Sequence, residues 1–239
     1  MRAAGELTGR TLNYIETLIK PGISTKELDE AAEEFIRSHG AVPSFLNYEG
    51  FPASICTSVN DRIVHGIPSR HDRLRDGDII SVDCALLNGF HGDAARTFLV
   101  GNVAPEVAKL VQVTKECFFK GLEQAVVGNH ISDIGRAIQQ HAESHGYGVV
   151  RELVGHGIGM NMHEAPEVPN YVIPHFGRGA RLVPGMAIAI EPMINLGTRR
   201  IHVLDDGWTC VTADGKPSAH YENTIFISEN GPEVLTNPE

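Results

Sequence analysis

Two aspartates, Asp83 and Asp93, are ten positions apart in the segment VDCALLNGFHGDAART, on either side of an Asn-Gly pair. An Asn-Gly pair favours the tight turn of a β-hairpin, because both central positions of that turn need a positive φ. A hairpin would bring the two carboxylates close together, but side chains alternate between the two faces of a strand. A strict two-residue turn at Asn88-Gly89 would place the aspartates on opposite faces, whereas a three-residue loop or a bulge would restore a common face.

Two further acids, Glu191 and Glu222, correspond to these aspartates in an internal repeat of the sequence. Four short words recur in the same order in both parts of the chain: ISTKELDEAAEEFIRSHG (23–40) with ISDIGRAIQQHAESHG (131–146), RIVHGIP (62–68) with RELVGHGIG (151–159), RLRDGDIISVD (73–83) with RLVPGMAIAIE (181–191), and HGD (91–93) with HYE (220–222). The two segments of the first pair have the apolar spacing of a helix, and each has a Ser near its start that can cap the helix. The segments of the three later pairs have the composition of strands. We therefore predict one catalytic domain, 1–239, which duplicates a helix-plus-hairpin unit over about 1–103 and 104–239.

The repeat would bring two acid pairs toward each other across a pseudo-twofold axis. Four carboxylates in one place repel one another and raise one another's pKa values unless cations neutralise them. Glu191 stands in the apolar segment MAIAIEPMI, where an unpaired charge would be expensive, so a merely solvated role explains it poorly. The four acids therefore indicate a metal site.

Three of the twelve histidines, His65, His156 and His163, lie in or beside the repeated words and are candidates to join the acids. His156 stands between glycines that would let the backbone approach a neighbour closely. An imidazole with four carboxylates makes a site for two divalent ions, and this hard donor set favours Mn²⁺, Fe²⁺ or Co²⁺ over structural zinc. Paired ions of this kind activate water, which predicts a hydrolase. Other histidines lie near helix ends, where we expect exposed or capping roles: His39, His141 and His145.

The rest of the sequence sets limits on the class of protein. Its 239 residues can bury a sizeable core without disulfides, and the composition, 42% hydrophobic and 21% charged, is ordinary for a globular protein. There is no apolar run near the length of a membrane span and no signal peptide. The net charge of −10 argues against nucleic-acid binding, and the four cysteines lack the spacing of a disulfide framework or a zinc site. We therefore expect a cytoplasmic monomer without membrane or specific nucleic-acid partners.

Five segments resemble the type I methionine aminopeptidases of the pita-bread fold, and the resemblance covers nearly the whole chain. These segments are VNDRIVHGIP, GFHGDAARTF, GHGIGMNMHEAP, AIAIEPMI and HYENTIFIS. The resemblance implies an α+β fold with two pseudo-symmetric helix-plus-antiparallel-hairpin halves around a central curved sheet. It also implies a metallo-exopeptidase that removes the N-terminal methionine from nascent proteins and peptides and prefers a small second residue.

The same resemblance implies roles for the metal ligands. Asp83 would chelate one divalent ion, while Asp93 and Glu222 would bridge both ions. His156 and Glu191 would complete the second ion's site. A metal-bridging hydroxide would attack the carbonyl of the first residue, with Glu191 assisting proton transfer. The free N-terminal amine would bind beside the ion held by Asp83, which makes the enzyme an exopeptidase.

The resemblance extends to residues that would hold the substrate. His163 would steady the carbonyl oxygen or the scissile amide, and His65 would help to bind the peptide and protonate the departing amine. Phe51 and Met162 stand where the family has Tyr and Phe, so the packing around a substrate methionine is expected to differ while the pocket stays apolar. An apolar and polarisable lining that suits a thioether is implied at five positions: Tyr48, Phe51, Cys56, Met162 and Trp208.

One departure from the family concerns the hairpin. The separation of Asp83 and Asp93 is one residue shorter than is usual in the family. Because both acids must reach the metal, we predict a three-residue loop or a bulge between them. A strict two-residue turn would put the metal assignment of Asp83 in doubt.

Two other functions on the same fold remain open. A proline-directed peptidase usually carries an extra N-terminal domain, for which 239 residues leave no room. A catalytically inactive binding module would be expected to have lost ligands, yet all five are present. Release of methionine from a Met-Ala peptide, compared with a proline-containing substrate, separates these functions. The expected partners are nascent-chain N-termini and, transiently, the ribosome, for which the basic loop SRHDRLR (69–75) is the candidate contact.

Overall fold

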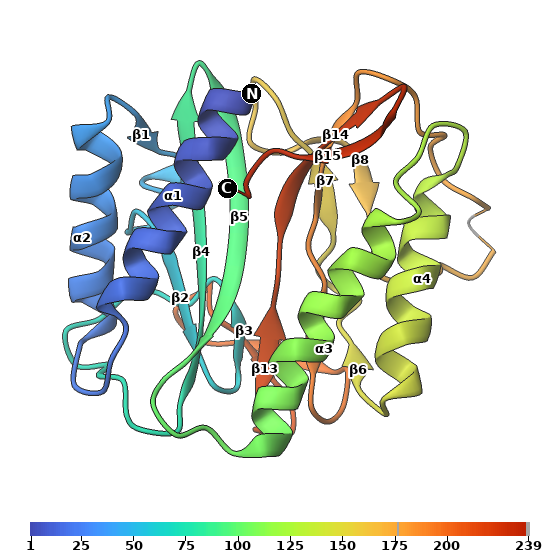
Figure 1. Ribbon diagram of the computed structural model, residues 1–239. Helices are drawn as coiled ribbons and strands as arrows, with labels where there is room; N and C mark the ends of the chain where they lie inside the picture. Colours follow the sequence, from blue (N-terminus) through green and yellow to red (C-terminus); the bar gives the residue numbers. More distant parts are fainter. Residues whose placement is uncertain (176, 238–239) are drawn as a thin grey trace.

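Each half of the molecule carries two helices packed beside its strands (Figure 1). α1 (Arg2–Leu18) and α2 (Thr25–Ser38) belong to the first half, and α3 (Pro105–Leu122) and α4 (Ile131–Ser144) belong to the second. The computed structural model describes residues 1–175 and 177–237. Among these residues no helix has both the length and the apolar character needed to cross a membrane.

The starts of α2 and α4 follow from short sequence patterns. Ser24 caps α2 in a capping box, in which its hydroxyl accepts from the N–H of Glu27 and its own N–H donates to the Glu27 carboxylate. The corresponding expectation for the second half is wrong, because Ser132 lies inside α4. The N-cap of α4 is His130, whose N–H donates to the carboxylate of Asp133. Asp133 therefore has the role that Glu27 has in α2, and His130 stands at the N-cap position expected of the serine.

The first half is built on one long hairpin, to which two short strands add. Leu87 pairs with His91 and Asn88 with Phe90, which leaves Gly89 alone at the tip with a φ of 76°. Counted from the Leu87–His91 pair, this turn is the predicted three-residue loop. The strands of this sheet are β1 (Val42–Pro43), β2 (Cys56–Val59), β4 (Ile79–Asn88) and β5 (Phe90–Leu99).

The length of this turn decides which way the two aspartates face. Asp83 lies opposite Ala95, and Asp93 lies opposite Ala85. The two acids are therefore diagonal neighbours on one face of the hairpin. A two-residue turn would have paired Leu87 with Phe90 and separated them, so the expectation of a shared face is confirmed.

The second half repeats the hairpin in an interrupted form. The pairs on either side of the interruption keep one register, which places Glu191 opposite Glu222 within it. Pro192 has no N–H to give to the ladder, which accounts for the interruption. Each long strand is therefore divided in two: β9 (Ala187–Ile190) and β10 (Met193–Asn195), then β13 (Ser218–His220) and β14 (Asn223–Ser228).

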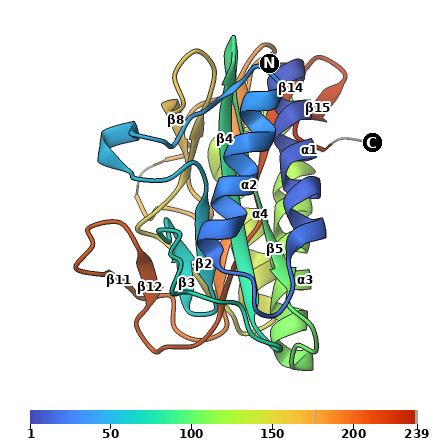
Figure 2. The ribbon, with the colours of Figure 1, turned by 90° about the vertical axis from the view of Figure 1, so that its left-hand side faces the viewer.

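Shorter strands complete the sheets around the two hairpins. One sheet has the order β15-β14-β9-β7-β8, and another has the order β13-β10-β6. A third, of order β11-β12-β3, lies on the side of the molecule opposite α1 and α3 (Figure 2). The bounds of these elements are β3 (Arg62–Val64), β6 (Gly148–Val149), β7 (Gly155–Gly157), β8 (Glu164–Val168), β11 (Ile201–Val203), β12 (Cys210–Thr212), β15 (Gly231–Val234) and the 3₁₀ turn η1 (Tyr48–Gly50).

The two halves are joined along a seam between β5 and the strand pair β13–β14. Ala95 and Glu222 exchange backbone hydrogen bonds of 2.9 and 3.3 Å. The hydroxyl of Thr224 accepts from the N–H of Asp93 at 3.0 Å and donates to its carbonyl at 2.9 Å. Thr97 makes the same pair of bonds to the backbone further along the seam. The seam therefore runs directly past Asp93 and Glu222.

Each half also has its own apolar core between its helices and its hairpin. All four cysteines are buried and unpaired, as expected for small apolar side chains. The first core includes Leu12, Ile15, Leu28, Ile36 and Ile80, and the second includes Leu110, Phe118, Ile134, Ile188 and Ile225.

Candidate metal centre

Four carboxyl groups converge where the two hairpins meet. Asp83 comes from β4 and Asp93 from β5, while Glu191 and Glu222 lie opposite each other at the interruption of the second hairpin. Asp83, Asp93 and Glu222 are buried, and the side chain of Glu191 is 13% exposed. Two acids from each half thus share one interior site.

Several oxygen atoms of this cluster have no hydrogen-bond partner. Within the described part of the chain, Oδ1 of Asp83, Oδ1 of Asp93 and Oε1 of Glu222 are buried and unpartnered. Ionised carboxylates without partners are very costly to bury, and divalent cations both neutralise and coordinate them. The ligand atoms of Asp93, Glu222 and His156 lie within 4.8 Å of one another, close enough to share an ion. The residues therefore fit a divalent metal centre.

The pKa values of the four carboxyl groups also indicate a metal site. Burial raises the pKa of Asp93 to about 7. Burial, together with repulsion from neighbouring carboxylates, raises the pKa values of Asp83, Glu191 and Glu222 well above their ordinary range. The site is therefore a place where cations and protons compete for the same oxygens.

His156 directs one nitrogen at the acids. Its Nε2 lies 3.6 Å from Oε1 of Glu191 and 3.9 Å from Oδ2 of Asp93. Its Nδ1 lies 2.9 Å from the carbonyl oxygen of Gly157, which can only accept, so the ring proton is on Nδ1 and the lone pair is on Nε2. Burial lowers the pKa of His156 to about 4, so the ring is neutral and able to ligate.

The glycines on either side of His156 allow β7 to lie close to its neighbours. A Cβ on Gly155 would lie 2.3 Å from the carbonyl oxygen of Ala189, and a Cβ on Gly157 would lie 2.3 Å from that of Ala165. No side chain fits at either position. The close approach predicted for this segment is confirmed, and it is what brings the imidazole to the acids.

His163 and His65 lie further from the acids and face the same cavity. The rings of His156 and His163 are 4.3 Å apart between centroids, and Nδ1 of His163 is 2.8 Å from the hydroxyl of Tyr48. His65 stands at φ 58° after β3, with its ring 6.2 Å from that of Trp208. Burial lowers the pKa of His65 to about 4.

A cavity of about 670 Å³ opens over the carboxylates. One side of it is apolar, where Phe51 and Trp208 meet edge to face at a centroid distance of 5.1 Å. All the residues expected to form the methionine pocket line this cavity together with the acids and histidines: Tyr48, Phe51, Cys56, Met162 and Trp208. The geometry places an apolar pocket beside a candidate metal centre.

Residues 1–229 match the model of a protein family described as Metallopeptidase family M24. The chain belongs to this metallopeptidase family. It is 59% identical over 237 residues to a methionine aminopeptidase of Clostridium acetobutylicum, which covers 99% of this chain and 94% of the relative. It is 52% identical over 237 residues, with the same coverage, to methionine aminopeptidase 1 of Bacillus subtilis.

Solved structures agree with the M24 assignment. Methionine aminopeptidase from Rickettsia prowazekii is 43% identical with a TM-score of 0.95, covering 98% of this chain and 94% of that one. The enzyme from Thermotoga maritima is 40% identical with a TM-score of 0.96, covering 100% and 95%. A prolidase from Pyrococcus furiosus, 22% identical with a TM-score of 0.76 over 63% of its length, shows the shared fold alone. The expected pita-bread fold and the resemblance to type I methionine aminopeptidases are confirmed.

His220 of this M24 peptidase was not among the site residues predicted from the sequence. This residue is 1% exposed, and its Nε2 lies 3.9 Å from oxygens of both Glu191 and Glu222. Neither ring nitrogen has a hydrogen-bond partner among the described residues, and burial lowers the pKa of the ring to about 3. The pattern that could have revealed it is the repeated word HYE, in which only the acid was interpreted.

Proposed function

We propose that this M24 peptidase is a metal-dependent methionine aminopeptidase that removes the N-terminal methionine from nascent proteins and peptides with a small second residue. The observation that carries the proposal is the set of buried carboxylates with unpartnered oxygens beside an apolar cavity. The names of the relatives, at up to 59% identity over nearly the whole chain, support the same activity. The domain is proposed to be a single unit, 1–239, duplicated at about 103/104.

The five ligands of the proposed centre come from both halves. Asp83 is proposed to hold one ion and Asp93 and Glu222 to be shared between two, while His156 and Glu191 serve the second. Carboxylate-rich ligands favour Mn²⁺, Fe²⁺ or Co²⁺. When bound, such ions lower the pKa of a water molecule and polarise a carbonyl group.

The protein's own groups supply proton transfer and orientation. Glu191 lies among the ligands at the edge of the cavity, and this carboxylate is proposed to accept the proton of the attacking water and release it later. The hydroxyl of Tyr48 lies 2.8 Å from Nδ1 of His163, and we propose that the phenol donates there so that the N–H of Nε2 donates to the substrate carbonyl oxygen or amide.

His65 is proposed to bind the peptide beyond the scissile bond. Because burial lowers its pKa to about 4, its ring is neutral at physiological pH and recognises the peptide by hydrogen bonding. It can protonate the departing amine only after it has received a proton itself. The proton released by the attacking water is a source for that transfer.

The apolar end of the cavity is proposed to select methionine. Phe51, Met162 and Trp208 pack in one cluster with Cys56, and the flexible, polarisable thioether of methionine suits such a lining. The similarity to prolidases is limited to the fold, so it does not support recognition of proline by this chain. An inactive binding module would not need the complete ligand set.

The proposal is tested by the release of methionine from Met-Ala-Ser. The chain is stripped of metal with a chelator and reloaded with Mn²⁺, Fe²⁺ or Co²⁺, and Asp83→Asn is compared with Asp205→Asn, an exposed aspartate. We expect metal-dependent release that Asp83→Asn lowers by more than about a hundredfold and Asp205→Asn leaves unchanged.

The other outcomes point to specific alternatives. Release that does not depend on Asp83 would remove this residue from the ligand set. Cleavage of a proline-containing peptide instead of Met-Ala-Ser would indicate the proline-directed peptidase. Failure to release methionine with any of the metals would favour the binding module.

The proposed substrate also implies where the enzyme works. N-terminal methionines arise during protein synthesis, so the enzyme is proposed to be a cytoplasmic monomer that meets nascent chains at the ribosome. In the loop 69–75, Arg70 forms an ion pair with Glu30, and Arg73 donates to the carbonyl of Gly22 at 2.7 Å. Loss of cosedimentation with ribosomes on neutralising Arg70, Arg73 and Arg75 would support this contact, and unchanged cosedimentation would exclude it.

A further inference from the structure

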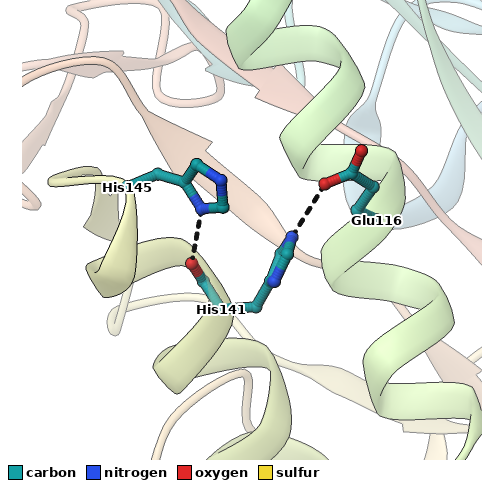
Figure 3. Close-up of side chains that lie close together, drawn as sticks. All are labelled: Glu116, His141 and His145. Carbon is teal, nitrogen blue, oxygen red and sulfur yellow. Dashed lines mark hydrogen bonds and ion pairs between the residues drawn. The ribbon is translucent and has the colours of Figure 1, made fainter.

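Away from the main centre, three side chains able to bind a metal ion meet between α3 and α4 (Figure 3). Glu116 comes from α3, His141 comes from the last turn of α4, and His145 is the C-cap residue that follows α4. One ligand atom from each lies within 4.8 Å of the other two. The side chains of Glu116 and His141 are 39% and 20% exposed, so an ion could reach them from solvent.

Neighbouring groups orient two of these donors, His145 and Glu116. Nδ1 of His145 lies 2.9 Å from the carbonyl oxygen of His141, so Nδ1 carries the proton and Nε2 carries the lone pair. The amide of Gln112 donates to Oε1 of Glu116 at 2.9 Å, and Nε2 of His141 lies 2.9 Å from its Oε2. Hydrogen bonds to the outer atoms of ligands are what fixes ligands in protein metal sites.

The internal repeat shows that one of these donors, His141, is not needed to end the helix, whereas His145 has a counterpart there. In the first half, Nδ1 of His39 lies 2.8 Å from the carbonyl oxygen of Phe35, as Nδ1 of His145 does from that of His141. Phe35 occupies the place of His141 and stacks on Tyr14 of α1 at 4.8 Å between centroids. Aromatic rings therefore pack between the two helices of the first half, whereas three ligating groups lie between the two helices of the second half.

We propose that Glu116, His141 and His145 bind one divalent transition ion, of the type of Zn²⁺, Ni²⁺ or Cu²⁺. Two imidazoles and one carboxylate suit these ions, and a water molecule can complete the coordination. The ion takes the place of the proton that Nε2 of His141 shares with Glu116. It links α3 to α4, and it is separate from the main centre and independent of the proposed peptidase function.

The test is the number of Zn²⁺ ions bound by the full chain. Metal-stripped protein is dialysed against Zn²⁺, and bound metal is measured for the natural chain and for His141→Phe, which copies the residue found in the first half. We expect His141→Phe to bind one Zn²⁺ fewer per chain. His39→Ala, at the equivalent helix end of the first half, is expected to bind the same number as the natural chain.

Two further measurements keep the result interpretable. Glu116→Gln keeps the size of the side chain and removes its charge, and it is also expected to lose one Zn²⁺. Methionine release by Mn²⁺-loaded His141→Phe is expected to equal that of the natural chain, which shows that the fold and the main centre are intact. If His141→Phe and Glu116→Gln bind as much Zn²⁺ as the natural chain, the cluster is only a hydrogen-bond network and the proposal is overturned.

Discussion

His220 is the residue whose surroundings are hardest to satisfy in the absence of a cation. Its ring is fully enclosed, both nitrogens lack hydrogen-bond partners among the described residues, and two carboxylates lie 3.9 Å away. A buried polar group without a partner costs about 1–3 kcal/mol. Such a cost at an interior position is typical of groups kept for function rather than for folding.

Replacing this ring with an apolar side chain should therefore stabilise the metal-free protein. We expect His220→Leu to raise the free energy of unfolding by about 1–3 kcal/mol, measured by urea denaturation in the presence of a chelator. His202→Leu, at an exposed position, should change it by less than about 0.5 kcal/mol. A destabilised His220→Leu would mean that the ring has a stabilising partner in the metal-free state.

The register of the β4–β5 hairpin is the single feature that most affects the site. The pair below the three-residue turn sets this register, and deleting Leu87 while the turn is kept would pair Cys84 with Asp93 and place Asp83 on the opposite face, or force the strands to slip. We expect the deletion to abolish Mn²⁺ binding, measured by equilibrium dialysis. The matched control is Gly89→Asn, because a Cβ there meets no atom within 4 Å and asparagine tolerates the positive φ. Equal Mn²⁺ binding by the two variants would contradict the parity argument.

The seam between the halves is the second element on which the site depends. Thr224→Val keeps the shape of the side chain but leaves the N–H and carbonyl of Asp93 without their hydroxyl partner. We expect a loss of about 1–3 kcal/mol for each group left unsatisfied, measured by urea denaturation. Thr212→Val removes one bond, to the carbonyl of Lys216, and should cost less. A smaller loss for Thr224→Val than for Thr212→Val would show that the seam contributes little.

The hairpins and their acids could be predicted from the sequence because the information is local or repeated. Asn88-Gly89 marks the turn, and the repeat links Glu191 and Glu222 to the aspartates. The position of His220 beside Glu191 and Glu222 depends on long-range pairing between β10 and β13, and the repeated segment HYE is its one trace in the sequence. The N-cap of α4 was not predicted either: the helix begins one residue before Ser132, so His130 stands at that position.

For the whole molecule, the carboxylate cluster makes stability depend on pH and metal. Burial raises the pKa of Asp93 to about 7 and moves those of Asp83, Glu191 and Glu222 upward, so the metal-free folded chain holds protons that the unfolded chain has released above about pH 4. The stability that these groups contribute is therefore lost as the pH rises through their folded pKa values.

The buried histidines change stability with pH in the opposite direction to the acids. Their effect determines the pH range in which the acids can be observed alone. Burial lowers the pKa values of His65 and His156 to about 4 and that of His220 to about 3, so their contribution is complete above about pH 6.5. In a chelator we expect the midpoint of thermal unfolding to fall between about pH 6.5 and 8, and Mn²⁺ to remove that fall. A flat profile in the chelator would show that the acids already have compensating partners.

The origin of the ligands in both halves has a consequence for the chain as a polymer. Asp83 and Asp93 precede the connection from β5 to α3, whereas Glu191 and Glu222 follow it. Ions bound by all four would act as a reversible cross-link that encloses α3 and α4 in a closed loop. Closing a long loop lowers the entropy of the unfolded chain, as a disulfide does, but this cross-link can be undone by a chelator. In this protein the catalytic ions would also hold together two halves that few covalent bonds connect.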